Sequence, residues 1–211
     1  RSAEIPAYFA GDRSLLQEPV IHFLLCAMEA ATAGLEQETV LTYLKSEFSP
    51  LEQERCDRLE NYVLLWNISG SRWERPWTMC PYGFARPQDA AGEALLAELN
   101  ESRALALQPL LALRDGLRRA GTTGEMVLAF HAFLEALSFR ERLNEQATAL
   151  YEAGDLQRAQ EYAQMYGILC TVLEQTYGVL GRSERTPEDF FAVLRTALSQ
   201  YQIGSIPASL D

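Results

Sequence analysis

The sequence predicts an all-α protein, an irregular bundle of about eight helices with a short extended segment at each end. Two observations predict the helices: apolar residues recur three and four positions apart through most of the chain, and proline or glycine interrupts this recurrence between segments. A third observation separates the two ends from the body, because "IPAYF" near the start and "SIPASLD" at the close favour extended backbone.

The first half of the chain contains three expected helices. Residues 1–15 combine a strand pattern with turn chemistry, and the stretch from Pro19 to Thr32 is apolar on nearly all sides, which predicts a buried helix. A second helix is expected over Gln37 to Phe48. The third is expected to begin with a capping box, with Ser49 as cap and Glu52 as its partner. Its predicted inner stripe is Cys56, Leu59, Val63 and Trp66.

The second half is helical from about Asp89 onwards. One helical stretch runs towards Ala120, and Pro109 is expected to kink or divide it. A helix follows at about Gly124 to Leu137, and Ser138 with Glu141 offers a second capping box for the next one. Thr186 and Pro187 begin the last helix, with an inner stripe of Phe190, Leu194, Ala197 and Tyr201, and Gly204 is expected to end it.

The most regular pattern runs from Asp155 to Leu180. Apolar residues alternate there in steps of three and four, which predicts a seam that packs closely against a neighbouring helix. The residues of this predicted seam are Leu156, Ala159, Ala163, Tyr166, Cys170, Leu173, Tyr177 and Leu180.

The composition excludes several classes of protein. Hydrophobic residues make up 48% and charged residues 22% of the 211 positions, as in an ordinary folded domain. No apolar run is long enough for a membrane span, and the start lacks the apolar centre of a signal peptide, so we expect a cytoplasmic location. The formal net charge of −11 opposes broad, non-specific DNA binding by this chain alone.

The stretch "NISGSRWERPWTMCPYGFARP" breaks the helical period for about twenty residues, a length at which loops are usually functional or packed down by their own side chains. Arg72, Trp73, Arg75 and Trp77 could form a platform for single-stranded DNA, since arginine binds phosphate and aromatic rings stack on bases. Alternatively, the rings anchor the loop to the helices while Arg72 and Arg75 pair with nearby acids. We favour the second interpretation because the net charge opposes phosphate binding.

The sequence carries no pattern typical of catalysis or metal binding. Phosphate-binding, nucleophile-elbow and zinc-protease motifs are missing from it. Its cysteines form no C-x-x-C unit, and His22 and Cys26, although four residues apart, have no second pair to complete a metal shell. His131 is expected to be a core or partly exposed histidine. The four cysteines of the chain are Cys26, Cys56, Cys80 and Cys170. We therefore expect no catalytic residue, metal or cofactor in this segment.

Two parts of the sequence carry a resemblance to known families. "IPAYFAGDRSLLQEPVIHFLLCAMEA" is similar to the segment of superfamily 1 helicases that opens the second motor domain and leads into its helical subdomain. "RLENYVLLWNISGSRW" and the stretch from "EAGDLQRAQEYAQ" to the close resemble the B subunit of the bacterial ATP-dependent helicase–nuclease (AddB, or RexB in some lineages). The most specific marks are Leu59 to Val63, Gly70, Trp73, Gly204, Ile206, Pro207, Leu210 and Asp211.

The resemblance implies that this chain is an internal fragment of a chain several times longer, which processes double-stranded DNA ends for recombinational repair. Residues 1–15 would be one edge of the second motor domain, 16–203 a helical insertion, and 204–211 the return towards the motor. The implied partners are the A subunit and DNA. ATP, magnesium and an iron–sulfur cluster would bind elsewhere in the parent, since the four cysteines here do not match that cluster's arrangement.

A different interpretation remains open. The chain could be a stand-alone helical scaffold that binds another protein through an apolar groove. The two interpretations differ in whether the natural gene extends well beyond both ends of this sequence.

Overall fold

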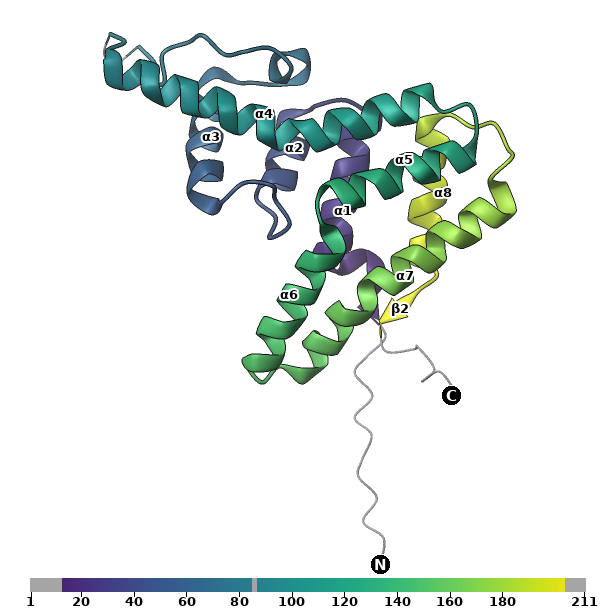
Figure 1. Ribbon diagram of the computed structural model, residues 1–211. Helices are drawn as coiled ribbons and strands as arrows, with labels where there is room; N and C mark the ends of the chain where they lie inside the picture. The colour runs from purple at the N-terminus through teal and green to yellow at the C-terminus, as the bar shows by residue number, and fades with distance from the viewer. Residues whose placement is uncertain (1–12, 85–86, 204–211) are drawn as a thin grey trace, which may run out of the picture.

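A computed structural model describes residues 13–84 and 87–203 of the chain (Figure 1). Eight α-helices, two short 3-10 helices and one pair of two-residue strands make up this part, so the predicted all-α class is confirmed. In chain order the elements are β1 (Arg13–Ser14), η1 (Leu15–Gln17), α1 (Pro19–Thr32), α2 (Gln37–Leu44), α3 (Gln53–Trp66), η2 (Gly70–Trp73), α4 (Ala90–Arg119), α5 (Thr123–Ala136), α6 (Phe139–Glu152), α7 (Leu156–Leu180), α8 (Pro187–Ser199) and β2 (Gln202–Ile203).

Helix α1 lies at the centre of the bundle, as its apolar sequence predicts. It contacts α2, α4, α8 and η1, so that almost every side of it is covered. The ring of Phe23 stacks on Tyr43 of α2 with centroids 4.9 Å apart, and on Phe139 of α6 at 6.2 Å. Phe48 completes this aromatic centre at 5.8 Å from Phe23. Burial of such large rings contributes much of the hydrophobic stabilisation of a core.

Helix α4 spans the whole molecule. It packs on α3 in one half and on α5 in the other, and Figure 1 shows it crossing the top of the bundle. Pro109 does not divide this helix, because α4 is continuous over 30 residues; the alternative, a kink at Pro109, stays a prediction. Proline removes one backbone hydrogen bond, and here the packing of α4 on α1, α3 and α5 offsets that loss. The side chain of Asp89 caps the helix by accepting a hydrogen bond from the Gly92 amide at 2.8 Å.

Both capping boxes predicted around serines are wrong. Helix α2 ends at Leu44, before the expected Phe48, and α3 begins at Gln53 with Glu52 as N-cap. Ser49 instead accepts a hydrogen bond from the Leu51 amide within the intervening turn. Arg142, far away in sequence, holds that turn by donating to the carbonyls of residues 47, 48 and 49.

The second predicted box fails for a local reason. Ser138 has a φ of 48° in the left-handed region, and its side chain makes no capping hydrogen bond. A residue in that conformation does not direct its hydroxyl at the free amides of the first turn, which needs extended backbone at the cap. A capping box does occur one helix earlier, between Thr122 and Glu125 at the start of α5.

The predicted seam of α7 is confirmed in part. Two of its members, Ala159 and Leu173, are buried, whereas Leu156 and Tyr177 are 60% and 52% exposed. The other buried residues of α7 lie beside the predicted positions: Tyr162, Met165, Ile168, Leu169, Val172 and Thr176. Because α7 contacts α5, α6 and α8, the covered face is decided by where those three helices lie. The last helix matches its prediction at its start, since Thr186 accepts from the Asp189 amide at 3.1 Å.

The two ends of the described chain meet. β1 and β2 pair antiparallel, with Arg13 opposite Ile203 and Ser14 opposite Gln202. The Leu15 amide also donates to the Tyr201 carbonyl at 3.3 Å. Of the extended segments predicted over 1–15 and 204–211, residues 1–12 and 204–211 lie outside the described residues, as does Gly204 as the end of the last helix; α8 itself ends at Ser199. Within the described part, no helix is both long and apolar enough to cross a membrane.

Helices α4 and α5 approach closely at a glycine, which gives a test of this packing. A Cβ on Gly116 would lie 2.9 Å from the Cβ of Ala129, whereas a Cβ on Gly167 in α7 would meet nothing within 4 Å. We expect Gly116→Ala to destabilise the chain by about 1–3 kcal/mol through overpacking. The matched Gly167→Ala should stabilise it by about 0.5–1 kcal/mol through helix propensity. Urea unfolding measures both, and equal shifts would contradict the close approach.

Candidate functional site

The loop of residues 67–88, here called the tryptophan loop, begins with two fixed turns. Asn67 ends α3 in the left-handed region with φ at 49°, and the Ile68 amide donates to the Val63 carbonyl at 3.0 Å. Gly70, with φ at +58°, donates its amide to the Leu35 carbonyl at 2.8 Å. The loop therefore leaves α3 in a direction that is set by backbone hydrogen bonds.

Two tryptophans of this loop point inward. Trp73 is 0% and Trp77 4% exposed, and their ring centroids are 5.6 Å apart. Trp77 also stacks on Tyr62 of α3, with centroids 4.8 Å apart and planes 16° from parallel. Both indole rings are thus part of the hydrophobic core, where each contributes a large buried apolar area.

Polar groups of α4 hold the same segment. Asn100 makes two reciprocal bonds with Trp77, accepting from its amide at 2.7 Å and donating to its carbonyl at 2.9 Å. Arg103 donates to the Trp73 carbonyl at 2.8 Å, and its guanidinium lies 5.9 Å from the Trp77 ring centroid. These bonds satisfy loop backbone groups that burial would otherwise leave without a partner.

The second half of the loop is tied to α3. The Tyr62 hydroxyl donates to the Met79 carbonyl at 3.0 Å, and the Trp66 indole donates to the Cys80 carbonyl at 3.1 Å. Trp66 is half-buried at the end of α3, as predicted, and Phe84 meets its ring edge-on at 5.3 Å. Phe84 itself is 95% exposed.

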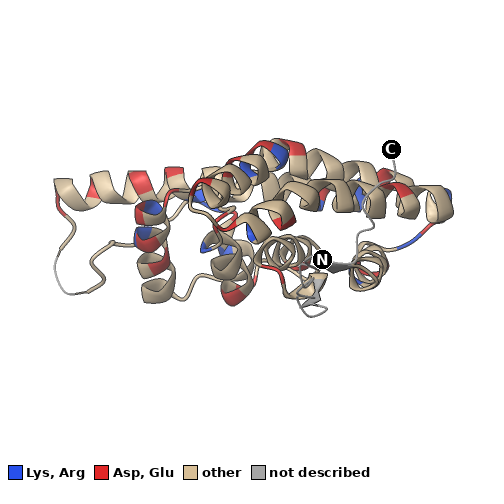
Figure 2. Ribbon diagram, turned by 90° about the horizontal axis from the view of Figure 1, so that it is seen from below, with Lys and Arg blue, Asp and Glu red and all other residues tan. Residues whose placement is uncertain are grey.

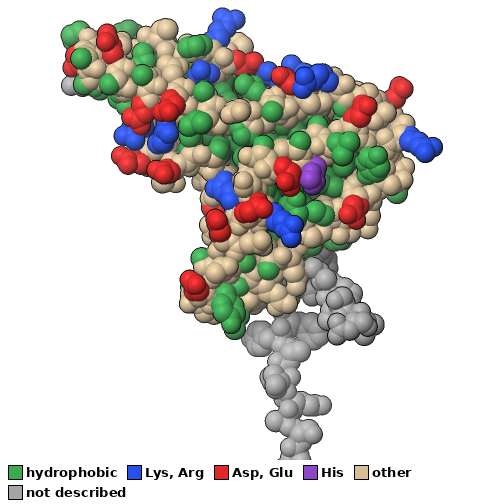
Figure 3. All heavy atoms as spheres, in the orientation of Figure 1, with side chains coloured by type: hydrophobic (Ala, Val, Ile, Leu, Met, Phe, Trp, Pro, Cys, Tyr) green, Lys and Arg blue, Asp and Glu red, His purple; other side chains and the backbone are tan. Residues whose placement is uncertain are grey.

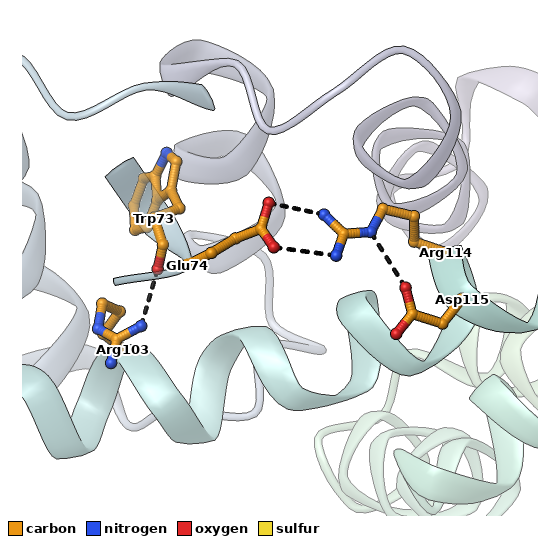
Figure 4. Close-up of polar contacts among 5 residues, drawn as sticks. All are labelled: Trp73, Glu74, Arg103, Arg114 and Asp115. Carbon is orange, nitrogen blue, oxygen red and sulfur yellow. Dashed lines mark hydrogen bonds and ion pairs between the residues drawn. The ribbon is translucent and has the colours of Figure 1, made fainter. Parts of the chain in front are cut away.

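An ion pair closes the loop against α4 (Figure 4). Arg114 donates two hydrogen bonds to the two carboxylate oxygens of Glu74, at 2.8 and 3.0 Å, and lies 3.4 Å from Asp115. The hydrogen bonds from Arg114 lower the pKa of Glu74 from its ordinary value, and the charges of Arg118 and Arg75 lower it further. The same contact raises the pKa of Arg114.

The four residues predicted to bind DNA are therefore split. Trp73 and Trp77 present no free ring face in this conformation, while Arg72 and Arg75 lie at the surface. Arg72 donates to the Asn67 carbonyl at 3.0 Å and approaches the Met79 sulfur at 3.7 Å. The geometry supports the interpretation that the rings anchor the loop. A DNA-binding role of the four residues stays a prediction.

Three residues that hold the loop escaped the sequence reasoning: Asn100, Arg103 and Arg114. All three lie on α4 at spacings of three and eleven, which the helical repeat places on one face. In the sequence these three residues form a polar stripe on an otherwise apolar face of the helix. Such a stripe indicates that the helix bonds another segment, but the sequence does not identify that segment.

The titratable groups outside the tryptophan loop were compared with the patterns of metal sites and reactive cysteines. Within the described ranges, no group of three or more His, Cys, Asp or Glu is arranged to hold a metal ion. His22 and Cys26 face each other across one turn, with the imidazole nitrogen Nδ1 3.7 Å from the sulfur, and burial raises the pKa of Cys26 to about 11. That thiol is therefore protonated at neutral pH and is a poor nucleophile. Figure 2 shows acidic and basic residues interspersed along the helices.

Comparison with known proteins shows which proteins the chain resembles. No protein-family model matches it. A Clostridium botulinum protein, named as the B subunit of an ATP-dependent helicase/deoxyribonuclease, is 29% identical over 209 residues, which are 98% of this chain and 18% of that protein. Proteins of the same name from Desulforamulus reducens and Anoxybacillus flavithermus are each 30% identical over 218 aligned residues, covering 98% of this chain and 18% and 19% of theirs.

This chain is homologous to a part of AddB, the B subunit of the ATP-dependent helicase/deoxyribonuclease. The family resemblance inferred from the sequence is confirmed. The chain spans less than a fifth of the length of the AddB relatives it matches. The tryptophan loop and the helices that hold it are therefore features of one segment of an AddB-like sequence.

Replacement of Trp73 tests how the loop is held. Trp73→Ala should lower the free energy of unfolding by about 3–5 kcal/mol, because it empties a buried site. Trp73→Phe should cost less, since it keeps a ring and removes an indole N–H that has no hydrogen-bond partner among the described residues. Urea unfolding monitored by circular dichroism measures both.

The double variant Arg72→Ala with Arg75→Ala tests DNA binding and is compared with Trp73→Ala. Its stability should stay close to that of the parent chain because both side chains are exposed. Weaker binding of a single-stranded oligonucleotide by the complete AddB protein, with a shallower salt dependence, would support the DNA platform. Unchanged binding, together with the loss of stability in Trp73→Ala, would leave only the anchoring role.

The ion pair of Glu74 predicts an acid-dependent stability. The folded pKa of Glu74 lies below its ordinary value of 4.5, so its contribution is complete above that pH and is lost as pH falls through the lower, folded pKa. Glu74→Gln should therefore cost up to about 1 kcal/mol near neutral pH, a modest amount because the Glu74 side chain is 37% exposed. Unfolding curves at pH 7 and pH 3 should differ less in Glu74→Gln than in the parent. An unchanged pH dependence would contradict the assignment.

Proposed function

We propose that this chain is a non-catalytic helical subdomain of AddB, the B subunit of a bacterial ATP-dependent helicase/deoxyribonuclease. In this proposal residues 16–203 are inserted into a helicase-like second motor domain. Residues 1–15 and 204–211 form the edges that lead out of and back into that domain. The parent protein would process double-strand DNA breaks for recombinational repair, together with an A subunit. ATP, magnesium and an iron–sulfur cluster would act elsewhere in the parent.

One observation carries the proposal beyond homology. An inserted domain leaves and re-enters its host at one place, so its two ends must lie side by side. β1 and β2 are antiparallel neighbours, with Ser14 opposite Gln202. Adjacent strands lie about 4.8 Å apart. Because the pair is antiparallel, the chain enters the helical body through β1 and leaves it through β2 at the same place, as an insertion requires.

The chemistry of the described residues supports a positioning role. The most specific polar contacts, those of Arg103 and Arg114, hold the tryptophan loop against α4. A long α4 that joins the α3 end to the α5 end makes the body a spacer of defined length. Such an element can set the distance between a motor and DNA or a partner protein.

The second candidate function is a scaffold that binds another protein. The observation in its favour is a groove of about 370 Å³ between α5 and α7, lined mainly by Val127, Leu128, Leu173 and Tyr177. Leu128 is 60% exposed, which leaves apolar area for a partner. The homology with a segment of AddB favours the first proposal.

A hairpin replacement in the complete AddB protein tests the insertion. Residues 15–201 are replaced by Asn-Gly, which joins Ser14 to Gln202 through the two-residue turn that suits antiparallel strands. We expect the shortened AddB to fold, to bind the A subunit, and to retain its own nuclease activity on a short single-stranded substrate. A flexible Gly/Ser linker at the same junction is the control and should give the same result.

Two outcomes would contradict the proposal. A shortened AddB that is insoluble with both connections would show that the helical body is part of the host's own core. A folded, assembled protein without nuclease activity would show that the body contributes to the chemistry.

A further inference from the structure

The hairpin formed by the end of α6 and the start of α7 projects from the body of the molecule (Figure 1). Of residues 144–161, which form its outer part, only Ala159 is buried. Gly154, with φ at +85°, makes the turn between the helices. The hairpin tip, as these residues are called below, thus leaves most of its surface uncovered.

The hairpin tip is held firmly at its base. The Tyr162 hydroxyl donates to Glu47 at 2.5 Å, and Arg142 donates to three carbonyls of residues 47–49. Phe139 and Leu143 are buried at the start of α6. The tip therefore stands at a defined place relative to the core.

One face of the hairpin tip carries no charge. A groove of about 620 Å³ lies between the two helices, and its lining consists of Asn144, Ala147, Thr148, Tyr151, Leu156, Ala159, Gln160 and Ala163. Tyr151 and Leu156 are 67% and 60% exposed. The charged residues of the tip, among them Glu152 and Asp155, lie outside this lining. An uncharged face with small residues between exposed apolar ones suits close packing against another protein surface.

The position of β1 and β2 indicates what would cover the uncharged face. In Figure 1 the β1–β2 pair and the hairpin tip lie at the same end of the molecule. A second cavity of about 770 Å³ is lined by Leu16 and Gln17, which follow β1, and also by Arg158 of the hairpin tip. Residues 159 and 160, next to Arg158, line the uncharged groove. A domain that continues from β1 and β2 would therefore leave the body at the same end as the hairpin tip.

We propose that the uncharged face of the hairpin tip packs against the host domain that β1 and β2 join. The inference rests on the proposed function, because the host is the remainder of the AddB chain. The contact makes a second attachment in addition to the two strands, and it fixes the angle at which the helical body stands on the host. Figure 3 shows the exposed hydrophobic side chains at the end of this hairpin.

Hydrogen–deuterium exchange compares the 211-residue chain with the complete AddB protein. Amides of residues 144–161 should exchange at least about tenfold more slowly in the complete protein, because docking opposes local opening of the tip. Amides of β1 and β2 report separately on the insertion. Protected strands with an unprotected tip would overturn the docking alone, whereas unprotected strands and tip would overturn the insertion as well.

Two variants, each replacing an alanine with glutamate, make the test specific to one face of the hairpin tip. Ala163→Glu places a carboxylate in the uncharged groove, and Ala149→Glu places one on an exposed position of α6 outside it. In the 211-residue chain both should shift the unfolding midpoint by no more than about 2 °C, as surface substitutions do. In the complete protein, Ala163→Glu should return the exchange of the tip to its rate in the isolated chain, while Ala149→Glu should not. Equal effects of the two variants would overturn the proposal.

Discussion

The fold depends on the need to cover α1 on nearly every side; only Pro19, His22 and Glu29 of this helix are exposed. A helix that is apolar all round has no face for water, so other elements must surround it. Phe23 illustrates the consequence, because its ring joins α1 to Tyr43 of α2 and Phe139 of α6, residues that lie far apart in the sequence. Helices α4 and α8 cover the remaining sides. Helices α2, α4 and α8 are thus arranged around one central helix, and η1, which follows β1, also contacts it.

The tryptophan loop shows how aromatic and basic residues can resemble a nucleic-acid platform while they serve the fold. The same pairing of arginine and indole that would bind a base and a phosphate occurs here inside the molecule, where Arg103 lies over Trp77. The cations that contact the loop come from α4, and the loop's own Arg72 bonds its backbone. In an acidic chain, such internal pairing also removes positive charge from the surface that phosphate would need.

Homology and geometry bear on function in different ways. The relatives relate this chain to a segment of AddB, and the antiparallel ends make that segment suitable as an insertion. Under the proposed function, the helical body would act through its shape. The length of α4 would set a distance and the hairpin tip would set an orientation, while the mainly apolar groove between α5 and α7 would leave room for a further contact. Each of these features depends on packing rather than on reactive groups.

The sequence by itself determined the class of fold, the number of helices and several of their ends. Pro19 and Thr186 mark helix starts through local backbone chemistry, which needs no tertiary partner. The tertiary structure decided which faces are covered. Leu156 and Tyr177 belong to a regular apolar pattern and yet lie exposed, because the 3.6-residue period predicts a helix but does not say where its neighbours lie. Ser49 and Ser138 fail as caps for two reasons. Arg142, distant in sequence, bonds the turn that holds Ser49, and the left-handed backbone of Ser138 directs its hydroxyl away from the free amides.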